Sequence, residues 1–139
     1  MRERALRIIL WIMAAVALEV GVWATFAPRS FYDDFPGGGA AWVSPDGPFN
    51  EHLVRDVGEL NLALAVVTVA AAITIARWAV VTAALAWLVY GVPHLVYHLR
   101  HLDAYDGSDQ PAVVISLAIA PIAAVAVLWL GGRKAPAEG

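Results

Sequence analysis

Cysteine is missing from the 139-residue sequence, and charged residues make up only 15% of it. The first absence excludes disulfide bonds, thiolate metal ligands, cysteine nucleophiles and dithiol redox chemistry. The formal net charge of -3, with no run of lysine and arginine, gives no basis for nucleic-acid binding. Phosphate-binding loops, serine nucleophile elbows and the HExxH zinc motif are also absent. Any chemistry here must therefore use histidine, carboxylates or a bound cofactor.

Apolar residues dominate what remains, since 60% of the chain is hydrophobic and its mean hydropathy is +0.67. Four stretches have the length of about 20 residues that a helix needs to cross a bilayer. These stretches are residues 8–27, 57–76, 78–99 and 112–130. The sequence therefore predicts an all-α integral membrane four-helix bundle, formed by residues 1–139 as one domain within the lipid bilayer.

Lysine and arginine sort between the two ends of this predicted bundle. One end would carry Arg2, Arg4, Arg7, Arg77, Arg133 and Lys134, and the other Arg29, Arg55 and Arg100. The positive-inside rule then predicts that both termini are cytoplasmic and that the protein crosses the plasma membrane of the cell. Residues 28–50 would form an outer loop against the bilayer surface, because their Pro, Gly and Asp content cannot continue a helix.

The first apolar stretch also has the basic start of a secretory signal. Its apolar run continues past Glu19 to Phe26, and Pro28 follows the only small-residue site that resembles a cleavage site. These features favour a helix that is retained in the bundle.

Three of the four histidines lie at the outer end of the third span. His98 and His101 follow His94 by four and seven residues. On a helix, residues at these offsets point within about 40 degrees of the direction of the first residue. They should therefore share one face. Pro93, just before them, removes a backbone hydrogen bond and predicts a kink in this span.

A second polar stripe repeats this spacing at the start of the second span, with His52, Asp56 and Glu59. Only Arg77 separates spans two and three, so an antiparallel hairpin is expected in which residues of equal depth have a nearly constant sum. This register pairs the two stripes: Glu59 with His94, Asp56 with His98, and His52 with His101. Glu19 lies at a similar depth on the first span, whereas Asn61 points to a different side of its helix.

Three roles are open for these side chains. Imidazoles and carboxylates on facing helices are the usual ligands for a transition metal such as iron, copper or zinc. The first role is therefore a metal site, with or without a redox function, and Glu19 would be a further cofactor contact. Its predicted ligands are His52, Asp56, Glu59, His94, His98 and His101. The same residues could instead form a buried polar network that only fastens helices in an accessory subunit. In the third role, Glu19 and Glu59 exchange protons in a carrier or a quinone or lipid binder, which with four spans would need a homodimer or larger membrane complex.

The layout of the chain resembles a known group. Four short spans, an acidic residue in the first span, Glu19, and the exit from that span through Pro28 and Arg29 are similar to the DoxX-like small four-helix membrane proteins. This resemblance implies a partner role beside respiratory oxidases.

Overall fold

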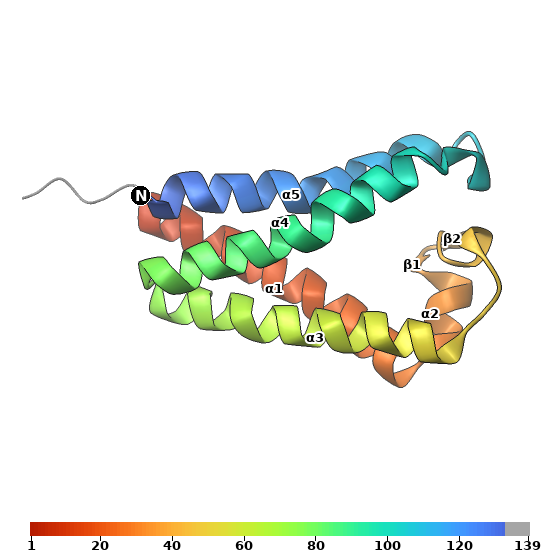
Figure 1. Cartoon of the computed structure of the whole chain (residues 1–139), viewed down its shortest axis with the longest axis horizontal. Helices are drawn as coiled ribbons and strands as arrows, with labels where there is room; N and C mark the ends of the chain where they lie inside the picture. The colour runs from red at the N-terminus through yellow and green to blue at the C-terminus, as the bar shows by residue number, and fades with distance from the viewer. Residues whose placement is uncertain (133–139) are drawn as a thin grey trace, which may run out of the picture.

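Four long helices make up most of the computed structural model, which describes residues 1–132. They are α1 (Arg2–Phe26), α3 (Glu51–Thr74), α4 (Arg77–Leu99) and α5 (Gln110–Gly132), as Figure 1 shows. Each is long and apolar enough to cross a membrane, which confirms the four predicted spans. Arg133 and Lys134, two of the residues behind the predicted orientation, lie outside the described residues.

Helices α1 and α3 begin earlier than the predicted spans, at Arg2 and Glu51. Hydropathy misses these first turns because they are polar. Asn50 fixes the start of α3, since its side chain accepts a hydrogen bond from the backbone N–H of Leu53 at 3.3 Å. At its other end α3 stops at Ile75, whose φ of 51° is left-handed and turns the chain into α4.

The long helices form two pairs, α1 with α3 and α4 with α5, within which the contacts are most extensive. Contacts between α3 and α4 are fewer, although only a short turn separates these helices in the sequence. Figure 1 shows the two pairs close together at the end that carries the N-terminus and diverging toward the opposite end. The predicted hairpin therefore forms its turn, but its two helices separate toward the outer end.

Small residues set the close approach of α1 and α3. A Cβ atom added to Gly58 would lie 2.5 Å from the backbone nitrogen of Thr25, and one added to Gly21 would lie 2.9 Å from Leu62 Cγ. Such small residues let two membrane helices bring their backbones together and gain dispersion contacts. The face of α3 that packs on α1 is thereby fixed by Gly58, not by its charged neighbours.

Two arginines fasten the ends of this helix pair. The Arg7 guanidinium in α1 donates to the carbonyl oxygens of Ala72, at 2.9 Å, and Ile73, at 3.1 Å, in the last turn of α3. At the opposite end, Arg55 in α3 donates to the carbonyl oxygen of Thr25 in the last turn of α1. A cation at the end of a helix satisfies free carbonyls and complements the helix dipole.

The segment between α1 and α3 is more ordered than the predicted outer loop. It contains α2 (Pro28–Asp34), strands β1 (Pro36–Gly37) and β2 (Ala40–Ala41), and the 3-10 turn η1 (Ser44–Asp46). Pro28 does not prevent a helix because it occupies the first turn of α2, where no backbone N–H is needed. Figure 1 shows α2 and the two strands at the end where the helix pairs diverge. A second short turn, η2 (Leu102–Ala104), connects α4 to α5.

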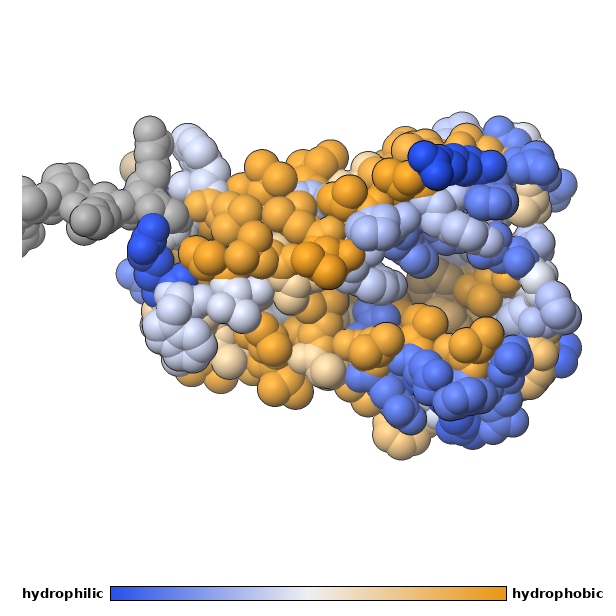
Figure 2. Space-filling view, in the orientation of Figure 1, coloured by the Kyte–Doolittle hydropathy of each residue, from blue (hydrophilic) through white to orange (hydrophobic). Residues whose placement is uncertain are grey.

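Apolar side chains lie both inside and outside the bundle. Leu10, Val80 and Val127 are fully buried in the core, while large apolar residues such as Leu60 and Val89 are exposed. Figure 2 shows the exposed ones as a broad orange band with polar residues at both ends. This distribution fits a bilayer around the middle of the helices.

Candidate ligand-binding cavity

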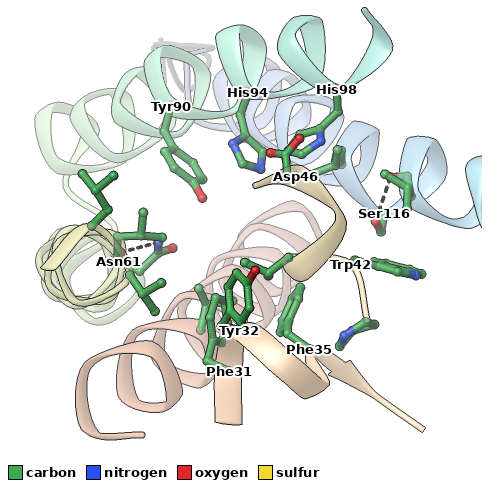
Figure 3. Close-up of a pocket in the computed structure, with 18 of the residues that line it drawn as sticks. Phe31, Tyr32, Phe35, Trp42, Asp46, Asn61, Tyr90, His94, His98 and Ser116 are labelled. Atoms are coloured by element: carbon green, nitrogen blue, oxygen red, sulfur yellow. Dashed lines mark hydrogen bonds between the residues drawn. The ribbon is translucent and has the colours of Figure 1, made fainter. Parts of the chain in front are cut away.

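A cavity of about 520 Å³ lies where the two helix pairs diverge. All four long helices contribute to its walls, and α2, η1 and Tyr105 complete them. Figure 3 shows Tyr90, His94 and His98 of α4 on one side, and on the opposite side Phe31 and Tyr32 of α2 with Phe35, which follows that helix. The volume falls within the range of about 300 to 1,000 Å³ that is usual for small-molecule sites.

The inner part of the cavity is apolar. Val16, Trp87 and Ala120 line it, from α1, α4 and α5. Trp87 itself is held in place because its indole N–H donates to Thr68 Oγ1 at 2.9 Å, a bond that joins α4 to α3. The separation of Trp87 from His98 along α4 gives the cavity a depth of about 16 Å at 1.5 Å per residue.

Polar side chains gather at the outer part of the cavity. The rings of Tyr90 and His94 stack with centroids 5.3 Å apart, and the centroids of His94 and His98 are 4.7 Å apart. In Figure 3 the Tyr90 hydroxyl and the His94 imidazole point into the cavity. Neither group forms a hydrogen bond with any part of the chain that the structure describes. Both therefore remain available to a ligand.

His98 is held by a residue beyond its own helix. The hydroxyl of Tyr105 lies 2.8 Å from His98 Nδ1, and both side chains are buried. The pKa of Tyr105 is raised to about 12, mainly by burial and to a smaller extent by the negative charge of Asp46. Tyr105 therefore stays protonated at neutral pH and offers His98 an uncharged partner.

Asp46 brings a negative charge to the outer part of the cavity. Figure 3 shows its carboxylate close to His94 and His98, at the end of η1. Tyr32 anchors this turn, since its hydroxyl donates to the carbonyl oxygen of Gly47 at 2.6 Å. The segment between α1 and α3 thus contributes an aromatic wall and an acidic side chain to the part of the cavity that the long helices leave open.

Asn61 faces this cavity from α3, as Figure 3 shows. It is 3% exposed, and its amide donates to the carbonyl oxygen of Val57 at 2.8 Å. The predicted difference in direction between Asn61 and Glu59 is confirmed, because Glu59 is exposed. Asn61 is thus a polar group at the inner part of an otherwise apolar wall.

The structure does not assemble the six-residue constellation predicted from the sequence. His94 and His98 line the cavity, but His101 is exposed and stacks on Tyr97 instead, with ring centroids 4.2 Å apart. Within residues 1–132, no three His, Asp or Glu side chains form a group that could hold a metal ion. The predicted facing of the two stripes is therefore wrong, and metal binding by any of these residues stays a prediction.

The second stripe lies on the outer side of α3. His52 and Asp56 form an exposed pair at 3.4 Å, and Glu59 is exposed as well. Glu19 on α1 is likewise exposed and does not line the cavity. The physical reason is that the inward face of α3 is taken by Gly58 and Asn61, which leaves the charged residues pointing outward.

Several lining residues were missed by the sequence reasoning. Tyr90 precedes His94 by four residues, so the helical spacing that groups the histidines also groups Tyr90 with them. Asp46 and Tyr105 come from connecting segments, whose positions no periodicity indicates. The aromatic residues of residues 28–50 gave a signal, but one that fits a membrane interface equally well.

Fold and cavity define a class, a small multi-pass membrane protein with four helical spans and an internal cavity near one end. The chain belongs to the family described as Domain of unknown function (DUF4345), whose model matches residues 5–130. No curated protein and no solved structure matches the chain. The expected likeness to DoxX-like proteins therefore holds for the four-helix layout, while the family that matches is DUF4345.

Proposed function

We propose that this protein binds an amphiphilic small molecule of the membrane, a lipid or a quinone, in the cavity between its helix pairs. The observation that carries the proposal is the graded lining: apolar around Trp87 and Ala120, and polar around His94 and His98. An amphiphile that lies with its tail toward the middle of the bilayer matches this gradient. A few polar groups in an apolar cavity are the usual design of a ligand site.

The level of the cavity in the membrane supports the same function. Figure 2 shows the molecule hollowed beside the polar end of the apolar band, on a face parallel to the long helices. On α3, which lines the cavity, charged residues extend from Glu51 to Glu59, and these two are exposed. Such residues belong at the level of lipid head groups. A lipid-like ligand could thus enter sideways with its head at that level.

We also propose the orientation in which both termini are cytoplasmic, in the plasma membrane of the cell. The end of the bundle that carries Arg2, Arg7 and Arg77 would then face the cytoplasm. The cavity would open in the outer half of the bilayer.

The binding proposal is tested by filling the cavity. Ala120→Phe places a ring in the inner apolar part and is expected to reduce the amount of co-purified lipid or quinone, measured by extraction and mass spectrometry. Ile119→Phe is the matched control, because Ile119 is 59% exposed on the outer surface of the same helix. Val57→Phe fills the cavity from α3 at a half-exposed position, in case Ala120→Phe does not fold. Equal ligand content in folded Val57→Phe, Ile119→Phe and the unaltered protein would refute the proposal.

A further inference from the structure

The charges around the cavity restrict the head group of its ligand. Among the residues that the structure describes, Asp46 is the one formally charged side chain in the lining. Its neighbours there are the neutral or weakly basic groups of Tyr90, His94 and His98. No lysine or arginine of residues 1–132 lines the cavity. A ligand head group would therefore meet hydrogen-bonding partners and one negative charge.

Two arginines beside the lining segments are already engaged, and Arg100, which follows His98 by two residues, is exposed and lies outside the lining. Arg29 in α2 pairs with Asp33 at 2.6 Å and lies over the ring of Phe49, 5.1 Å from its centroid. Arg55 in α3 pairs with Glu51 at 2.8 Å and donates to the carbonyl oxygen of Thr25. A phosphate brought into the cavity would face Asp46 with no lysine or arginine of residues 1–132 in the lining to compensate, and an unpaired charge in an apolar site is costly.

We infer that the cavity selects a neutral amphiphile, whose hydroxyl or carbonyl head is bound by Tyr90 and His94, and that it rejects phosphate-bearing lipids. This inference rests on the proposed function, since it concerns the ligand of the same cavity. The Tyr90 hydroxyl can donate to a carbonyl or accept from a hydroxyl, and a neutral His94 imidazole offers one donor and one acceptor. Asp46 supplies the discrimination, because it repels an anion and tolerates an uncharged head.

A matched set of ligands tests the inference. The detergent-solubilised, delipidated protein is titrated with oleyl alcohol, oleyl phosphate and a benzoquinone with a decyl chain, and bound species are measured by native mass spectrometry. The alcohol or the quinone, or both, should bind at least about tenfold more tightly than oleyl phosphate. Binding of the alcohol alone would identify a hydroxyl head, and binding of the quinone alone would identify a carbonyl head.

Charge removal then isolates the role of Asp46. Asp46→Asn should reduce the factor by which neutral ligands bind more tightly than oleyl phosphate. Asp103→Asn, at an exposed position in η2 outside the lining, should leave this factor unchanged. The inference would be overturned, and the proposed function left standing, if the unaltered protein bound oleyl phosphate as tightly as the better-bound neutral ligand. The same conclusion would follow if Asp46→Asn left the ratio of neutral-ligand to oleyl phosphate affinity unchanged. Absence of binding by all three ligands, or binding that Ala120→Phe and Val57→Phe do not alter, would instead overturn the proposed function.

Discussion

Tyr105 holds one of the two cavity histidines without adding a charge. Its side chain is 5% exposed, and its hydroxyl lies 2.8 Å from His98 Nδ1. When this hydroxyl donates to Nδ1, the proton of a neutral His98 is on Nε2. A single residue from the connection between α4 and α5 thus holds the His98 ring through its Nδ1 atom, and we regard Tyr105 as a positioning residue.

Titration of Tyr105 gives a prediction at high pH. Burial raises its pKa to about 12, whereas a tyrosine in an unfolded chain titrates near 10. Between about pH 10 and 12 the unfolded chain binds fewer protons, so the free energy of unfolding should fall as pH rises through this window. In a spectrophotometric pH titration, Tyr105→Phe should lack the increase in tyrosinate absorbance that occurs at the highest pH. Tyr97→Phe, which removes a half-exposed tyrosine, should retain that increase; if Tyr105→Phe also retains it, the assignment to Tyr105 is wrong.

Hydrogen bonds to the ligand should be measurable at Tyr90 and His94. Each hydrogen bond contributes about 0.5 to 1.5 kcal/mol, so Tyr90→Phe and His94→Ala should each weaken binding of the preferred neutral ligand about two- to tenfold. The comparison uses the native mass spectrometry titration described above. His101→Ala is the control, because His101 is exposed and outside the cavity. A loss in His101→Ala as large as that in His94→Ala would favour the histidine cluster predicted from the sequence over the cavity.

Helix positions could be predicted from the sequence, but helix partners could not. Hydropathy located all four spans, and the spacing of four residues correctly placed His94 beside His98. The orientation of α3 failed because charged groups were expected to face inward, away from lipid. In the outer turns of α3 they face outward, where Glu51 pairs with Arg55. Gly58 decides the inward face by letting α1 approach, and this depends on a steric fit between two helices that one sequence does not show.

The close approach at Gly58 predicts a destabilising effect of one methyl group. In Gly58→Ala the new Cβ would meet the backbone nitrogen of Thr25, so either α1 or α3 must shift. Overpacking of this kind costs about 1 to 3 kcal/mol. Thermal unfolding in detergent should show a lower midpoint for Gly58→Ala. Gly107→Ala should be nearly neutral, because an added Cβ there meets nothing within 4 Å; equal midpoints for the two variants would contradict the packing argument.

The whole molecule combines a closely packed end with an open end. Trp87 and Thr68 join the two helix pairs at the inner limit of the cavity. Beyond this level the pairs diverge, and the segment between α1 and α3 supplies Asp46 and the aromatic wall. Such a site depends on contacts between distant parts of the chain, which explains why the sequence indicated its histidines but neither its acid nor its depth.

Absence of cysteine makes the sidedness of the molecule directly testable. Ser108→Cys, in the connection between α4 and α5, and Thr74→Cys, at the last residue of α3, are conservative changes at exposed positions on opposite ends of the bundle. The arginines near Thr74 should hold that end in the cytoplasm. A thiol reagent that cannot cross membranes should therefore label Ser108→Cys in intact cells, and Thr74→Cys only after permeabilisation. The reverse pattern would invert the proposed orientation and move the cavity to the cytoplasmic half of the bilayer, so that its ligand would come from the inner leaflet.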